Sequence, residues 1–168
     1  RFYRHRGHFL TAIREFSIAE EDLYKATKLI DGKEDALEPD NIDGSVIEPA
    51  STLHYNIWLY FGFVQYALGD FADAAEAFQS AFDIAGNDDT RITAADWLYL
   101  SLIRSNQVEK AQAVLQNVNN RADVSDAKSY QIRLQMYADG STEFNIDEAT
   151  QNPFEKITIQ YGRAMILM

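Results

Sequence analysis

Residues 55–86 read YNIWLYFGFVQYALGDFADAAEAFQSAFDIAG, and this stretch decides the fold. Its apolar residues recur at intervals of three and four, which predicts two α-helices, and Gly69 lies at the turn between them. Small residues at Gly62 and Ala74 allow the two helices to approach closely, and the large ring of Phe78 fills the space around them. The segment therefore predicts an antiparallel pair of helices.

The same pattern occurs on both sides of this pair. Residues 7–26 repeat the glycine and the apolar positions of the pair, and residues 97–118 repeat the apolar positions. Asn106 stands where the other two segments have Arg14 and Gly69. Asparagine suits that place because it tolerates the left-handed backbone conformation that ends such a helix. A repeated helix pair predicts an array rather than an isolated hairpin.

With these spacings the chain resembles the tetratricopeptide repeat (TPR) family over roughly two thirds of its length. The resemblance implies an all-α fold, a right-handed α-solenoid of antiparallel helix pairs. From Gly7 to Gly62 is 62 − 7 = 55 residues, so against a period of about 34 the first junction holds about 21 extra residues. We expect helices at about residues 2–14, 16–30, 52–68, 71–85, 91–105, 108–119 and 126–138, and a last helix from 153.

We expect one domain, residues 1–168, in which these helices form successive units. The units lie at about 1–30, 52–86 and 91–119, followed by a degenerate unit at 126–151 and a partial unit at 153–168. Tyr161-Gly162 resembles the first helix of a further unit. The last helix ends in the apolar run 165–168, which needs a cover.

Residues 31–51 form the acidic insertion between the first two units. Its Asp, Gly and Pro residues oppose a continuous helix, so we expect an irregular segment that covers the mouth of the groove or protrudes. The run Asp40–Gly44 suggests a calcium loop, but its ligand alternation breaks at Asp43 and no bidentate glutamate follows at the required spacing. We expect no metal site.

The composition excludes several classes of protein. The formal charge is −11 and the pI is about 4.6, which argues against binding to nucleic acid. The absence of cysteine excludes disulfides and thiolate chemistry. No apolar run reaches the length of a membrane span. The chain begins at Arg1 rather than methionine, so we expect a preceding segment, and the compartment stays open.

One basic cluster stands out on this acidic chain, at Arg1, Arg4, His5, Arg6 and His8. It is either a solvated helix end or the basic end of a binding groove, suited to an acidic peptide. His5 and His8 have a metal-ligand spacing, but no third ligand is evident. No nucleophile motif or phosphate-binding loop occurs, so we expect neither an enzyme nor a bound cofactor.

In a solenoid of this type the first helix of each pair lines the concave face. Leu59, Phe63 and Tyr66 form one stripe on such a helix, which is either buried by its neighbours or free to bind a ligand. The side chains expected in the groove are Arg4, His8, Asn56, Leu59, Tyr60, Phe63, Tyr66, Asp96, Trp97, Leu100 and Arg104.

The family resemblance implies a protein–protein interaction scaffold that holds an extended or helical peptide of a partner in this groove. The TPR variant that grips a terminal carboxylate uses a Lys/Asn/Arg pattern where this chain is mostly aromatic or aliphatic, so an apolar or helical peptide fits better. The alternatives are a self-assembling module that dimerises through its C-terminal helix and an accessory domain of a larger enzyme. The arrangement also resembles bacterial repeat proteins that are exported or lipid-anchored.

Overall fold

The computed structural model describes residues 1–38, 50–118, 122–141, 143 and 145–167 of the chain. In these residues the fold is all-α, as predicted, and its only β pairing is an isolated bridge between Leu37 and Thr52. The helices are α1 (Phe2–Ala12), α2 (Phe16–Ile30), α3 (Leu53–Leu68), α4 (Phe71–Ile84), α5 (Asp88–Arg104), α6 (Val108–Asn117), α7 (Lys128–Asp139), α8 (Ile146–Ala149) and α9 (Pro153–Ile166).

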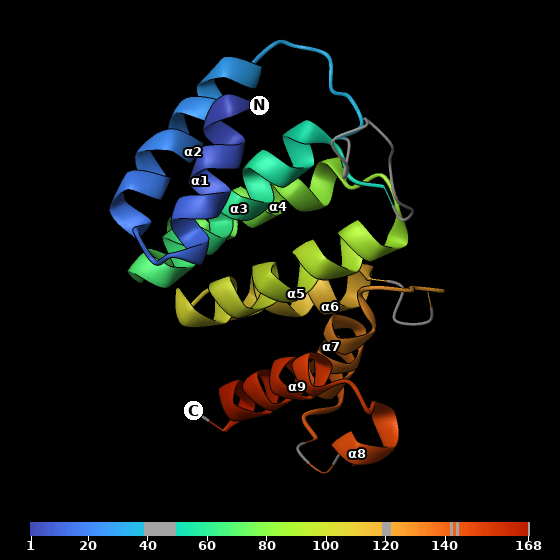
Figure 1. Ribbon diagram of the computed structural model, residues 1–168. Coiled ribbons are helices and arrows are strands. Elements are labelled where there is room, and N and C mark those ends of the chain that lie inside the picture. The colour runs from blue at the N-terminus through green and yellow to red at the C-terminus, as the bar shows by residue number, and fades with distance from the viewer. Residues whose placement is uncertain (39–49, 119–121, 142, 144, 168) are drawn as a thin grey trace.

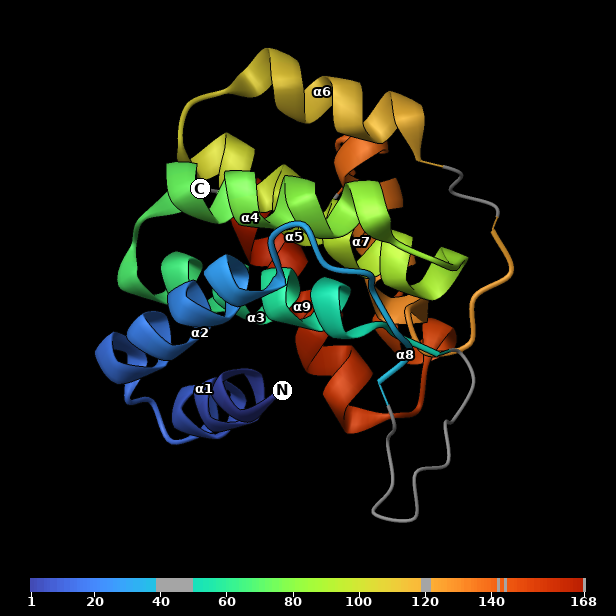
Figure 2. The same cartoon turned by 90° about the horizontal axis from the view of Figure 1, so that it is seen from above.

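From α1 to α7, each helix packs against the next one in the chain (Figure 1). Seen from above, α6 and α1 lie on opposite sides of the molecule, and α9 crosses the middle and extends toward the side of α1 (Figure 2). α7 packs against α5 and against α9. The sequence analysis placed α7 and α9 in separate units, whereas here they pack against one another across the segment that carries α8.

The turns between paired helices share one backbone feature. Arg14, Gly69, Asn106 and Gly140 all have positive φ, between 61° and 92°. Each of these residues lies one or two positions beyond the last residue of its helix. The predicted left-handed conformation of Asn106 is confirmed. Four turns with the same conformation at the same place indicate that the pairs are built alike.

The start of α5 differs from the prediction because of a capping box. The Asn87 side chain accepts a hydrogen bond from the Thr90 backbone N–H at 2.9 Å, and the Thr90 hydroxyl lies 3.3 Å from the Asn87 backbone nitrogen. These bonds satisfy donors at the helix end, so the helix begins at Asp88 rather than near residue 91.

Glycines set the distance between paired helices. A Cβ added to Gly7 would lie 2.6 Å from Leu23, and one added to Gly62 would lie 2.7 Å from the Phe78 ring. The large side chain follows the glycine by the same interval in both pairs (23 − 7 = 16 and 78 − 62 = 16). In the α7–α9 pair the glycine lies on the second helix instead of the first. Gly162 of α9 faces the bulky side chain of Arg133 on α7.

The acidic insertion is anchored at both ends. The Glu38 backbone N–H donates to the Ser51 carbonyl at 3.0 Å, and the Glu38 side chain is buried. Its carboxylate lies 2.9 Å from the Arg4 guanidinium and accepts a hydrogen bond from Asn56 at 2.7 Å. The predicted irregular course of residues 39–49, and their position relative to the groove, lie outside the described residues. Glu38 itself belongs to the interior, where it neutralises a buried arginine.

Candidate binding site

Five of the side chains predicted to line the groove are instead buried. Leu59 and Leu100 belong to the main hydrophobic core. Arg4 and Asn56 are held by Glu38, and Asp96 is fully buried. These residues support the surface from beneath, so they are not free to contact a partner.

The half-buried residues of the predicted set form a continuous row of rings. The rings of His8 and Tyr60 are 4.4 Å apart, and Phe63 lies edge-on to Tyr60 at 5.9 Å. Phe63 then meets Trp97 edge-on at 5.0 Å, and Tyr66 meets the same indole at 5.3 Å. The row begins on α1, follows α3 and ends on α5.

Helix α9 adds a ring that the sequence analysis did not assign to the groove. The Tyr161 ring lies 6.1 Å from Trp97, and its hydroxyl lies 3.0 Å from the hydroxyl of Tyr66. Burial, and next this hydrogen bond, raise the pKa of Tyr66, so its hydroxyl stays protonated at neutral pH. The sequence contained one signal for this contact, which is the small residue Gly162 beside Tyr161.

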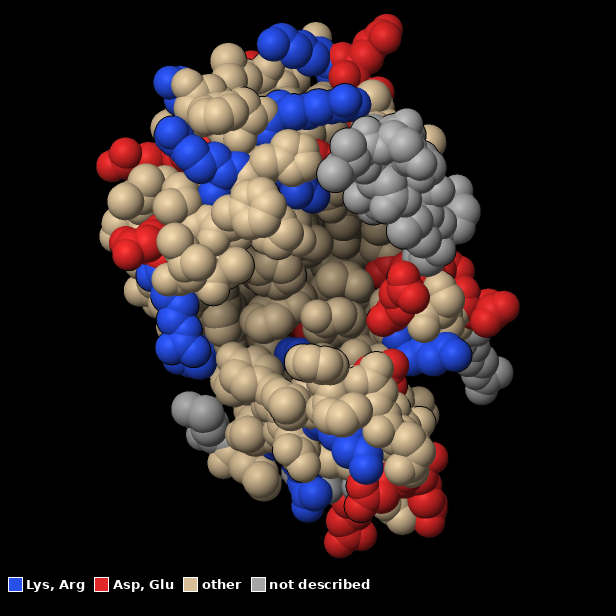
Figure 3. All heavy atoms as spheres, in the orientation of Figure 1, with Lys and Arg blue, Asp and Glu red and all other residues tan. Residues whose placement is uncertain are grey.

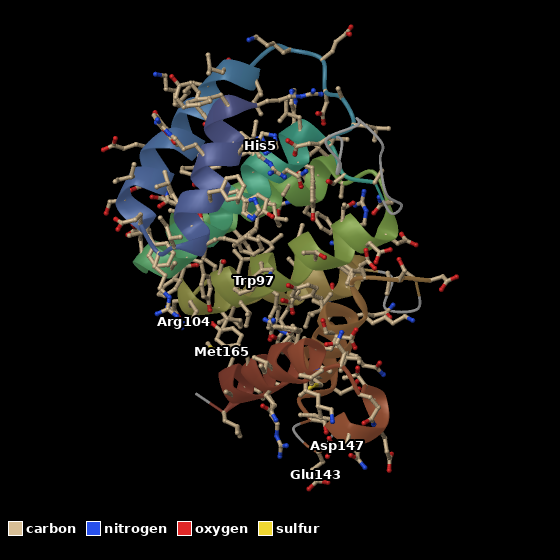
Figure 4. All side chains as sticks on the ribbon, viewed as in Figure 1. His5, Trp97, Arg104, Glu143, Asp147 and Met165 are labelled. Carbon is tan, nitrogen blue, oxygen red and sulfur yellow. The ribbon has the colours of Figure 1, made fainter. Side chains whose placement is uncertain are left out.

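We call the five rings of Tyr60, Phe63, Tyr66, Trp97 and Tyr161 the aromatic hollow. Figure 3 shows the face on which it lies as a depression with uncharged walls, and most of the charged side chains in view lie around its edge. Figure 4 places Trp97 between α1 and α9, with Met165 below it and Arg104 toward one end of α5. The hollow thus presents apolar and aromatic surface to any molecule that enters it.

A buried ion pair supports the floor of the hollow. The Arg133 guanidinium on α7 lies 2.9 Å from the Asp96 carboxylate, and both side chains are shielded from solvent. The same guanidinium lies 5.3 Å from the Trp97 ring and 5.4 Å from the Tyr161 ring. Burial raises the pKa of Asp96 to about 7, and the charge of Arg133 opposes that rise. The pair holds α5, α7 and α9 in one arrangement.

The basic cluster of α1 is largely engaged within the chain. Arg4 pairs with Glu38, and Arg6 donates to the Asp22 carboxylate at 2.6 Å. Burial lowers the pKa of His5 and of His8 below the ordinary value of 6.5, which favours the neutral form of both rings. The cluster therefore presents less positive charge to the groove than its composition suggests.

Arg104 is the one exposed member of the predicted set. Its guanidinium lies 4.2 Å from the centre of the Phe71 ring, at the end of α5 that is nearest to Met165 in Figure 4. It can offer a polar contact at the edge of the hollow.

The described residues lack a metal-binding cluster and a membrane-spanning helix. They contain no group of three or more His, Asp or Glu side chains arranged to hold a metal ion. No described helix has both the length and the apolar character needed to cross a bilayer.

Comparison of the chain with family models, with curated protein sequences and with solved structures finds no match.

Proposed function

We propose that the chain is a TPR-like right-handed α-solenoid that acts as a protein interaction scaffold. Two observations favour this architecture. The glycine and its large partner recur at the same interval in the first two pairs, and the turn of each of these pairs has a left-handed residue just beyond its first helix. In such a fold the first helices of successive pairs form the concave face. The hollow takes its rings from α3 and α5, two of these first helices, and from α9.

The observation that carries the proposal is the gathering of five half-exposed or exposed rings at one place on the surface. Aromatic rings at a depression are typical of the anchoring pockets of protein interfaces. The hollow continues along α9, where Phe154 is 81% exposed and Ile157 is 63% exposed. These two residues and Tyr161 follow the spacing i, i+3, i+7 and form one stripe. The occupant is a peptide segment with an apolar face.

The experiment that tests the proposal is a selection from a random peptide library displayed on phage. Peptides that bind the wild-type protein are expected to carry several apolar or aromatic residues on one face. They should lose at least about tenfold in affinity for Ile157→Glu, because a charge replaces apolar contact area at the interface. Val108→Glu is the matched control, since Val108 is also exposed but lies on α6 (Figure 2).

Ile157 is a better position for this test than Phe63. The Phe63 ring packs against Trp97 and Phe78, so Phe63→Glu would place a carboxylate among rings and lower stability as well as binding. Ile157→Glu leaves the packed face of α9 intact. Selected peptides that bind wild type, Ile157→Glu and Val108→Glu equally would contradict the proposal.

Self-association through α9 is the second candidate function. The exposed stripe of Phe154, Ile157 and Tyr161 favours it as well, because a second copy of a chain can bury an apolar face of this kind in a dimer interface. Met165 and Ile166 already pack against the core, so the available surface is confined to the outer side of α9. Sedimentation equilibrium of wild type and Ile157→Glu separates the two candidates, because only self-association gives a dimer that the substitution abolishes.

A further inference from the structure

A second concave surface lies on the other side of α3. α2 and α4 both pack against α3 and leave a groove of about 520 Å³ between them, which we call the α2–α4 groove. Trp58, Phe61 and Gln65 form its floor and follow the spacing i, i+3, i+7 on α3. At 3.6 residues per turn this stripe lies about 130° around α3 from the one that carries Phe63 and Tyr66. The groove is therefore separate from the aromatic hollow.

Both walls of the groove are acidic. Glu20 and Glu21 lie on the α2 wall, and Asp73 and Glu76 lie on the α4 wall. The lining includes no Lys, Arg or His side chain. Within the part of the chain that the structure describes, none of these four carboxylates forms an ion pair. Two carboxylates on each side of one groove favour a ligand with more than one positive charge.

A buried amide on the floor of the groove is left without a partner. The Gln65 side chain lines the groove although the residue is only 5% exposed. Its amide oxygen has no hydrogen-bond donor among the described residues. A buried acceptor without a donor is costly, and a ligand that supplies an N–H removes that cost. This observation is independent of the acidic walls and points to a ligand that donates hydrogen bonds.

The aromatic side chains of the groove suit a cation. Tyr24, Trp58 and Phe61 lie together, with centroid distances of 6.2 Å between Tyr24 and Phe61 and 6.4 Å between Trp58 and Phe61. The faces of such rings attract ammonium and guanidinium groups. Tyr24 already shows this behaviour, since the Lys28 ammonium lies 4.8 Å from the centre of its ring.

We propose that the α2–α4 groove binds arginine side chains of a basic peptide segment in a partner protein. Guanidinium is favoured over ammonium because its planar group stacks on rings and donates several N–H bonds at once. One such group can stack on Trp58, and a second, about two helical turns farther along α3, can donate to the Gln65 amide oxygen. Carboxylates on both walls favour a segment with at least two arginines, which a peptide supplies and a small molecule with one guanidinium does not.

The test uses the two tryptophans of the chain as separate reporters. Trp58 lines the groove and Trp97 lies in the hollow, so their indole N–H resonances distinguish the two sites by NMR. The probes are an acetylated, amidated hexapeptide with two arginines, its lysine and glutamate counterparts, and agmatine as a free guanidinium. We expect the arginine peptide to shift the Trp58 resonance saturably, to leave Trp97 unchanged and to bind more tightly than the other probes.

Two variants with the same net charge distinguish binding in the groove from general attraction of a basic peptide to an acidic protein. Glu21→Gln/Glu76→Gln removes one exposed carboxylate from each wall, and affinity for the arginine peptide should fall at least about tenfold. Glu109→Gln/Glu148→Gln changes the net charge equally on α6 and α8 and should leave that affinity unchanged. Equal losses in both variants, an equal shift of Trp97, or agmatine binding as tightly as the peptide would overturn the proposal.

Discussion

Asp96→Ala is expected to lower the free energy of unfolding by about 3–5 kcal/mol, because it leaves the Arg133 guanidinium buried without a counter-charge. Arg133 is 1% exposed, and a guanidinium does not lose its proton in a protein. Its closest carboxylate in the described structure is Asp96, at 2.9 Å. Urea denaturation followed by circular dichroism measures the loss.

Substitution of Arg133, the other member of the ion pair, provides the control. Arg133→Met leaves Asp96 alone in the core, where burial holds the pKa of its carboxyl above the ordinary value of 3.8. A group with a raised pKa in the folded state stabilises the fold at low pH and loses that contribution as the pH rises. The stability of Arg133→Met should therefore fall as the pH rises from about 4 to beyond 7, because the pKa of Asp96 is already about 7 with Arg133 present and Arg133 lowers it. A double variant, Asp96→Leu/Arg133→Met, should recover much of the loss, and no recovery would contradict this account of the pair.

Phe78→Ala is expected to destabilise the fold by about 3–5 kcal/mol, since it opens a cavity in the main hydrophobic core. The ring is fully buried, lies against Gly62 and meets the rings of Phe63 and Trp97 at 5.4 Å and 6.1 Å. Loss of the ring therefore removes support from beneath the hollow as well as from the α3–α4 pair. Thermal and urea denaturation measure the effect.

Phe154→Ala is the matched control for this prediction. It removes the same ring from a position that is 81% exposed, so the change in stability should be within about 0.5 kcal/mol. Similar losses for Phe78→Ala and Phe154→Ala would show that the close approach at Gly62 does not stabilise the fold.

The helices could be predicted from the sequence because the residues that specify each helix lie within it or next to it in the chain. Apolar spacing and turn residues set most helix ends to within two residues, and Asn106 shows how one residue type indicates a left-handed turn. The start of α5 was missed because Asn87 and Thr90 cap each other, a detail that apolar spacing does not contain.

The site was harder to predict because its contacts join distant segments. Helical spacing places Asn56, Leu59 and Phe63 on a groove-facing side of α3, but it does not show which of them Glu38 or the core will bury. The position of α9 depends on the contact of Gly162 with Arg133, across 29 residues (162 − 133 = 29). Only the folded chain shows that Tyr161 completes the hollow and that Asp96 lies beneath it.

The position of a selected peptide on the protein tests the central claim most directly. The measurement is a titration of the wild-type protein with that peptide, followed through the two indole N–H resonances. If the aromatic hollow is the binding surface, the Trp97 resonance shifts saturably and the Trp58 resonance does not. A peptide that binds with an unchanged Trp97 resonance would contradict the assignment of the hollow as the partner-binding site.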